Sequence, residues 1–288
     1  MRCPSSIIAK MSYIALLLVV VFSGAVSAQR FAIVAPVSSA NSEAFSSEVS
    51  SSLTAAGSKV IDESLSSSVF RSRRIDEPFN LTTAEAKNLT AAIGCEYMLL
   101  YRVETVRRAS FSRPDYYQAF AVLYLVSART GRLADWRLIS EEAENEAEAR
   151  QRLYRSVPAT MKQILGKLHI NTQTERTESV PSIEEVPDEN SPAAKGLRPP
   201  VPYRRIKPEY TSIASFYNVR ATVDILADVS EVGEITRTEI VRWAGFGLDE
   251  SVISAVRKMN WRPAMRNDKP LPMRVLLRYN FTKVENDQ

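Results

Sequence analysis

The chain has 288 residues, of which 45% are hydrophobic and 24% are charged, with a formal net charge of +4. This composition is typical of a folded globular protein and excludes an intrinsically disordered chain. The length predicts two domains of ordinary size. Basic residues are spread along the chain rather than gathered in a dense stripe, so we expect no nucleic-acid partner.

The first 28 residues have the organisation of a secretory signal peptide. Arg2 and Lys10 precede an apolar run over residues 13–26, which ends in the small-residue motif Val26-Ser27-Ala28. A basic region, a short apolar region and such a motif are the three parts of a cleavable signal. We therefore expect residues 1–28 to be removed. The alternative is an uncleaved inner-membrane anchor over residues 12–28, although a spanning helix needs about 20 apolar residues.

Residues 30–169 predict a domain in which strands and helices alternate. Runs of strand length lie at residues 31–37, 59–62, 97–106, 117–127 and 133–140. Helical patterns lie at residues 45–56, 82–93 and 142–168. Thr82 and Glu85 form a capping box at the second of these helices, and Pro158 should end or kink the third because proline has no amide hydrogen. The expected fold is an α/β layer domain with a mixed sheet.

Residues 170–202 predict a linker. This stretch is rich in proline and acidic residues and has no apolar periodicity. It therefore cannot bury enough apolar surface to offset the entropy lost on ordering, and its prolines favour an extended, semi-rigid spacer. We expect two separate bodies joined by a short tether.

Residues 203–288 carry the pattern of a small antiparallel sheet covered by one helix. Apolar residues alternate over residues 219–229 and again over residues 273–281, and Gly233 permits a turn between strands. Leu248 and Asp249 predict a helix start, with Asp249 as the N-cap. A three-stranded antiparallel sheet with a helix on one face is the economical arrangement. The whole chain is thus expected to be α+β.

Trp261 and Pro263 follow this predicted helix. We expect structural roles for both residues rather than a ligand site. Trp261 should close the core after the helix, and Pro263 should hold the chain extended towards the final strand.

The order and spacing of these stretches resemble the C-terminal domain of the TonB family over residues 203–285. The matching stretches are Lys207-Pro208-Glu209-Tyr210, residues 219–225, Gly233-Glu234-Ile235, Gly247-Leu248-Asp249, Trp261-Arg262-Pro263-Ala264, residues 267–271 and residues 273–281. Ala221 stands where the family commonly has glycine, and Thr211 stands where proline is usual. The resemblance implies a periplasmic domain that binds other proteins and performs no chemistry of its own.

A second resemblance concerns residues 30–169. Residues 81–97 and 121–132 resemble the α/β domain shared by the curli-secretion protein CsgG and the N-terminal domain of TolB. In that group the helix leads into a Gly-Ala-Asp strand, whereas this chain has Gly94-Cys95-Glu96. The resemblance covers about half of the chain.

The TonB resemblance implies that the final strand receives partners. An open sheet edge offers unpaired amides and carbonyls to an extended peptide, and TonB-family domains receive short segments of outer-membrane receptors in this way. The candidate partner-binding residues are Met273, Arg274, Val275, Leu276, Leu277, Arg278, Tyr279, Asn280 and Phe281. Arg274, Arg278 and Asn280 either tune the choice of peptide or are ordinary solubilising side chains. Pairing of two such edges leaves a homodimer open.

The sequence carries no pattern of catalytic or metal-binding residues. His169 is the only histidine, which excludes a metal site with two histidine ligands. Cys95 lies beside an apolar strand and is expected to be a small buried residue. We therefore expect no enzyme activity, no cofactor and no metal.

Two functions agree with these features. The first is a component of TonB-type transport across the outer membrane. The second is a soluble periplasmic adaptor or assembly factor without an energy-transducing role. TonB proteins use a histidine in their membrane anchor to couple to a proton-driven motor, and residues 12–28 contain none.

Overall fold

The computed structural model describes residues 29–37, 39–111, 113, 115–177 and 182–282. We call residues 29–177 the N-terminal part and residues 182–282 the C-terminal part. The signal peptide, or anchor, predicted over residues 1–28 lies outside the described residues. Within the described ranges, no helix combines the length and the apolar character needed to cross a membrane.

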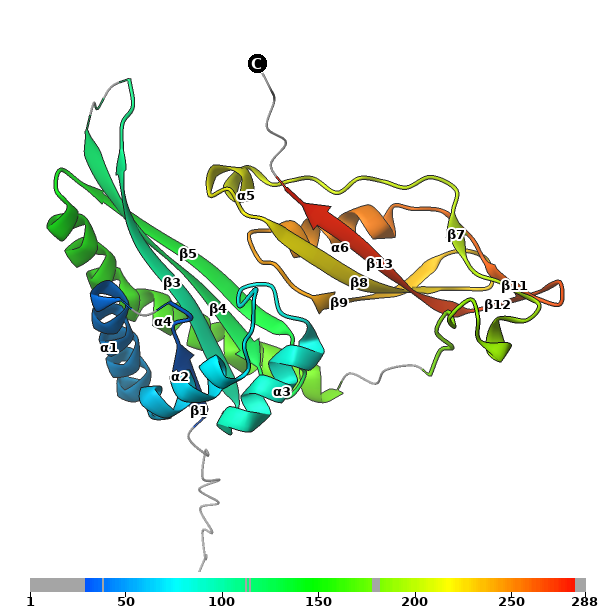
Figure 1. Cartoon of the computed structure of the whole chain (residues 1–288), viewed down its shortest axis with the longest axis horizontal. Coiled ribbons are helices and arrows are strands. Elements are labelled where there is room, and N and C mark those ends of the chain that lie inside the picture. Colours follow the sequence, from blue (N-terminus) through cyan, green and yellow to red (C-terminus); the bar gives the residue numbers. More distant parts are fainter. Residues whose placement is uncertain (1–28, 38, 112, 114, 178–181, 283–288) are drawn as a thin grey trace, which may run out of the picture.

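The N-terminal part is built on a five-stranded mixed sheet in the order β2-β1-β3-β4-β5 (Figure 1). β1 lies parallel to β2 and β3, and the remaining neighbours are antiparallel. The elements are β1 (Arg30–Val34), α1 (Ala40–Ala55), β2 (Lys59–Val60), α2 (Glu63–Ser72), α3 (Thr83–Ile93), β3 (Tyr97–Arg108), β4 (Tyr116–Ser127), β5 (Leu133–Ala143) and α4 (Glu146–Thr177). The mixed sheet is as predicted, whereas α2, with Asp62 as its N-cap, is an additional helix.

Side-chain contacts explain where α3 begins and why α4 continues through a proline. At α3, the amide of Glu85 donates to the side chain of Thr82, and the amide of Thr82 donates to the side chain of Glu85. α4 passes through Pro158 rather than ending there. Proline removes only one backbone hydrogen bond, and the buried side chains of Leu153 and Met161 hold the turns on either side against the sheet.

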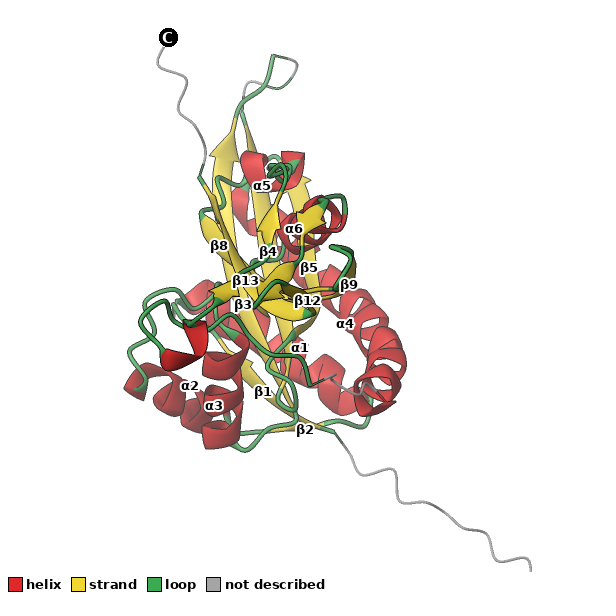
Figure 2. Cartoon of the chain, turned by 90° about the vertical axis from the view of Figure 1, so that its right-hand side faces the viewer, coloured by secondary structure: helices red, strands yellow, loops and turns green. Residues whose placement is uncertain are grey.

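The two faces of the five-stranded sheet bury different partners, because successive strand residues point to opposite faces. One face, with Leu99 and Leu123, packs against α1 and α4. The other face, with Met98 and Tyr124, packs against α2, α3 and the C-terminal part. Figure 2 shows α2 and α3 on one side of the sheet and α4 on the other.

The C-terminal part contains a three-stranded antiparallel sheet in the order β13-β8-β9. Val223 and Ile225 of β8 are buried in one cluster with Val252 and Val256 of α6, so the helix covers one sheet face, as predicted. The elements are η1 (Pro192–Ala194), β6 (Leu197–Arg198), β7 (Val201–Pro202), α5 (Ser212–Phe216), β8 (Ala221–Val229), β9 (Ile235–Arg242), α6 (Leu248–Arg257), β10 (Trp261–Arg262), β11 (Ala264–Arg266), β12 (Lys269–Leu271) and β13 (Met273–Phe281).

Much of the predicted linker has secondary structure. α4 continues to Thr177, past residue 169, where the first domain was expected to end. β6 and β7 pair antiparallel with β11 and β10. These two-residue strands pair through backbone groups rather than through apolar side chains. Such pairing leaves no apolar periodicity in the sequence.

The two parts share one hydrophobic core, so the expectation of two separate bodies is wrong. Tyr124 of β4 and Trp243 of the loop after β9 lie in one buried cluster, with their ring centroids 5.7 Å apart. In the same loop, Phe246 stacks on Trp136 of β5 at 5.3 Å. These aromatic side chains of the C-terminal part cover a portion of the sheet face that α2 and α3 also cover.

Candidate functional site

β13 is an edge strand, because β8 is its only neighbour in the sheet as described. Backbone groups along an antiparallel strand point alternately towards and away from the neighbouring strand. The amide of Arg274 points away from β8, since it donates to the carbonyl oxygen of Glu184 at 2.8 Å. By the same alternation, the amides and carbonyls of Leu276, Arg278 and Asn280 point outward along the edge.

The two arginines predicted to tune peptide choice are held on the sheet face opposite α6. Arg274 donates to Asp228 from Nε at 2.6 Å and from Nη2 at 2.9 Å, and both residues are buried. Arg278 donates to the Asp224 carboxylate in the same way, from Nε at 2.7 Å and from Nη2 at 2.9 Å. The Arg278 side chain is 58% exposed. Bidentate pairs of this kind fix orientation as well as charge. Arg274 is therefore a buried partner of Asp228 and not a solubilising charge.

Asp224 connects three strands of the sheet. It lies on β8, accepts from Arg278 of β13, and also accepts from Nε of Arg242 of β9 at 3.3 Å. Burial alone would raise the pKa of the Asp224 carboxyl, but the hydrogen bonds and charges of Arg278 and Arg242 outweigh it and hold this pKa below its ordinary value. The carboxylate is thus ionised, and its ion pairs with Arg278 and Arg242 join both outer strands to β8.

A segment of the predicted linker, residues 184–186, lies beside the beginning of β13. Its pairing with β13 is parallel, centred on Glu185 and Arg274. The amide of Val186 donates to the carbonyl oxygen of Arg274 at 3.0 Å. The Glu184 carboxylate accepts from both terminal nitrogens of Arg266, at 3.0 and 2.6 Å. The edge of β13 is therefore paired at Arg274 and carries no such partner, among the described residues, from Leu276 onwards.

The residues predicted to be structural lie around the same sheet. Gly233 has a φ of 85°, and a Cβ placed on it would lie 2.0 Å from the carbonyl oxygen of Trp261. The Trp261 side chain is buried in the shared core. Pro263 separates β10 from β11. Leu248 is fully buried at the first position of α6.

Asp249 is not the N-cap of α6, contrary to the prediction. The helix begins at Leu248, and Gly247 occupies the cap position without a side-chain hydrogen bond. The carboxylate of Asp249 instead accepts from the amides of Ala244 and Gly245, each at 2.9 Å. The cause is the loop before the helix, where residues 245–247 all have positive φ and turn these amides towards Asp249. Burial raises the pKa of Asp249 from 3.8 to about 7, although both amide hydrogen bonds act to lower it.

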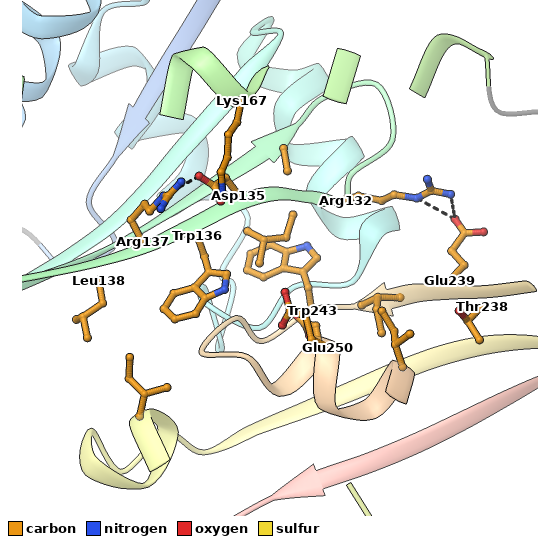
Figure 3. A pocket seen from close by; sticks show the side chains of 16 residues that line it. Arg132, Asp135, Trp136, Arg137, Leu138, Lys167, Thr238, Glu239, Trp243 and Glu250 are labelled. Carbon is orange, nitrogen blue, oxygen red and sulfur yellow. Dashed lines mark hydrogen bonds and ion pairs between the residues drawn. The ribbon is translucent and has the colours of Figure 1, made fainter. Parts of the chain in front are cut away.

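A cleft of about 660 Å³ lies between the two parts, along β5, β9 and the beginning of α6 (Figure 3). Arg132 pairs with Glu239 across it at 2.6 Å. Asp135 accepts from Arg137 at 2.8 Å and lies 3.6 Å from Nζ of Lys167. This cleft could not be predicted from the sequence, because its walls come from segments that are far apart in the chain. The ion pairs along its walls join side chains to one another, and we assign the cleft no function.

Residues 206–282 match the model of the family described as Gram-negative bacterial TonB protein C-terminal. This segment is similar to the TonB C-terminal family. We call it the TonB-type segment. It contains α5, β8, β9, α6 and β10 to β13, and hence the open edge and the two bidentate ion pairs. No curated protein matches the chain.

Several solved structures are similar to parts of the chain. The TonB C-terminal domain of Pseudomonas aeruginosa is 16% identical, with 38% of this chain and 100% of that chain covered and a TM-score of 0.27. The hypothetical protein CT253 of Chlamydia trachomatis is 14% identical, covering 48% and 99%, with a TM-score of 0.34. Lipoprotein GNA1162 of Neisseria meningitidis is 16% identical, covering 48% and 99%, with a TM-score of 0.33. Likenesses this distant carry no argument about function, and the resemblance of the N-terminal part to CsgG and TolB stays a prediction.

Proposed function

We propose that this protein binds extended peptide segments of envelope proteins by strand addition at β13, and that this binding serves TonB-type transport across the outer membrane. The observation that carries the proposal is the outward direction of the backbone groups of Leu276, Arg278 and Asn280 in a segment similar to the TonB C-terminal family. Among the described residues, these outward groups have no backbone hydrogen-bond partner. The apolar side chain of Leu276 beside them is 56% exposed.

The geometry suits a peptide of modest affinity. Three outward-facing residues offer three amides and three carbonyls to an added strand. Each backbone hydrogen bond contributes about 0.5–1.5 kcal/mol net, and binding loses translational and conformational freedom. Contact with Leu276 adds apolar burial. An outer-membrane receptor or another envelope protein in the periplasm is the proposed source of the peptide, and no catalysis is involved.

A soluble periplasmic adaptor or assembly factor is the second candidate. The shared core favours it, because Trp243 and Phe246 fix the orientation of the TonB-type segment relative to the N-terminal sheet. Such a unit would present two surfaces at a constant spacing. The intact mass and membrane fractionation of the native chain separate the candidates. A soluble species that begins at Gln29 supports the adaptor, and an uncleaved chain in the inner membrane supports transport.

Strand addition is tested by substitution at Leu276. Leu276→Pro removes an outward amide while leaving the hydrogen bonds between β13 and β8 in place, and proline is tolerated on such an edge. Leu276→Ala is the matched control, because it removes the same side chain but keeps the amide. The probes are synthetic peptides that cover the periplasm-exposed segments of the outer-membrane receptors of the source bacterium.

We expect Leu276→Pro to weaken peptide binding about tenfold beyond Leu276→Ala, since one hydrogen bond and the strand geometry beside it are lost. Circular dichroism should show both variants folded. Equal binding by the two variants, or the absence of binding by every peptide to the wild type, would contradict strand addition at this edge.

A further inference from the structure

The segment of residues 184–186 is bound to β13 in the way an added strand would be. Its two backbone hydrogen bonds, from Arg274 to Glu184 and from Val186 to Arg274, use both outward groups of Arg274. The pairing direction is parallel. Among the described residues, no backbone hydrogen bond joins the chain after Val186 to β13. The segment thus covers one end of the edge and leaves the rest open.

Charge holds this segment as well as backbone pairing. Arg266 of β11 binds the Glu184 carboxylate through both terminal nitrogens, and this hydrogen bond lowers the pKa of Glu184. Nη1 of Arg274 lies 3.9 Å from the Glu185 carboxylate. Two consecutive acidic residues therefore lie against two arginines of the TonB-type segment. An incoming strand in the same register would meet the same two guanidinium groups.

We propose that residues 184–186 are a resident competitor for the partner peptide, and that the peptide which displaces them is acidic at the positions of Glu184 and Glu185. This inference rests on the proposed function of the β13 edge. A tethered segment competes at an effective concentration on the order of millimolar. A partner must therefore make additional contacts, along Leu276, Arg278 and Asn280, to displace it.

The test uses the full chain and a fluorescent peptide with the sequence of residues 182–190, added in trans. Glu184→Gln together with Glu185→Gln weakens the resident segment, and Val186→Pro weakens it independently by removing the amide that donates to Arg274. Glu189→Gln is the matched control, because Glu189 is an exposed acidic residue of the same segment for which no ion pair is recorded among the described residues.

We expect the double variant to bind the peptide about two- to tenfold more tightly than the wild type, the range for loss of exposed ion pairs. Val186→Pro should give a gain of similar size, about the worth of one backbone hydrogen bond, and Glu189→Gln should match the wild type. A second peptide, with glutamine at both acidic positions, should bind the double variant several-fold more weakly than the first.

If neither linker variant binds more tightly than the wild type, residues 184–186 are not a competitor. If the glutamine peptide binds as well as the acidic one, the charge preference is wrong. The proposed function fails separately: receptor peptides would then bind neither the wild type nor the double variant, while the trans peptide still distinguishes the two chains.

Discussion

Asn80 and Thr222 exchange two hydrogen bonds, from Asn80 Nδ2 to the Thr222 carbonyl oxygen at 2.8 Å and from the Thr222 amide to Asn80 Oδ1 at 2.9 Å. β9 ends at Arg242, opposite Asp224. The Asn80 side chain therefore occupies the place beside β8 that a further β9 residue would take. Asn80 Nδ2 also donates to the carbonyl oxygen of Trp243 at 2.7 Å. The side-chain amide of Asn80 thus joins the N-terminal part to the sheet of the C-terminal part through three hydrogen bonds.

Asn80→Ala should lower the free energy of unfolding by about 2–3 kcal/mol, because it leaves the buried carbonyl of Trp243 and the partly buried backbone groups of Thr222 without this partner. Urea denaturation measures this change. Asn88→Ala, on the exposed face of α3, is the control and should change stability by less than about 0.5 kcal/mol. An equal effect of the two substitutions would show that Asn80 does not join the two parts.

The shared core predicts that the two parts unfold together. Calorimetry of the wild type should show one transition, because Trp243 is buried against Tyr124 and donates from Nε1 to the carbonyl of Gly131 at 3.2 Å. Trp243→Ala should cost about 3–5 kcal/mol and separate the transition into two. Trp243→Phe keeps most of the ring and should cost much less. Two transitions in the wild type would mean that the parts are independent.

Asp249 gives stability a specific dependence on pH. Its pKa is raised by burial from 3.8 to about 7 in the folded protein, so the folded state holds a proton that the unfolded state has released. This contribution to the free energy of unfolding is complete below about pH 4 and is lost as the pH rises to about 7. Asp249→Asn resembles the protonated form and should remove this decline. Identical pH profiles for the two proteins would refute a raised pKa.

Gly233→Ala tests the close approach of the β8–β9 turn to Trp261. The added Cβ would lie 2.0 Å from a backbone oxygen, at a φ of 85°. We expect a loss of more than about 2 kcal/mol, the sum of steric overlap and left-handed strain. Gly57→Ala is matched for φ, at 82°, but its Cβ would meet no atom within 4 Å. It should therefore cost only about 1 kcal/mol. Equal costs would exclude the contact with Trp261.

The sequence predicts the elements of each part well where side-chain patterns are regular. Alternation along β8 and β13, the turn at Gly233 and the capping box of Thr82 all appear in the structure. Each of these signals is local, since it depends on residues within one turn or one strand pair. Burial of one sheet face is enough to impose such a pattern.

The packing of the two parts against each other could not be predicted, because the residues that make these contacts follow no periodic sequence pattern. Trp243 and Phe246 lie in the loop between β9 and α6, in which residues 245–247 have positive φ, and no periodic sequence pattern marks their burial. Asn80 acts through its side chain on a distant backbone, and residues 184–186 act through backbone atoms alone. The candidate edge was predicted from family resemblance and alternation. The pairing of its first outward residue with the linker was not.

Hydrogen exchange of the amides along β13 tests the central claim most directly. In the free protein, the amide of Arg274 should exchange slowly because it donates to Glu184, whereas those of Leu276, Arg278 and Asn280 should exchange rapidly. A receptor peptide at saturation should slow exchange at these three amides, with those of Val275 and Leu277 already protected by β8. Slow exchange at all three amides in the free protein, or no change when peptide binds, would contradict an open edge that receives a partner strand.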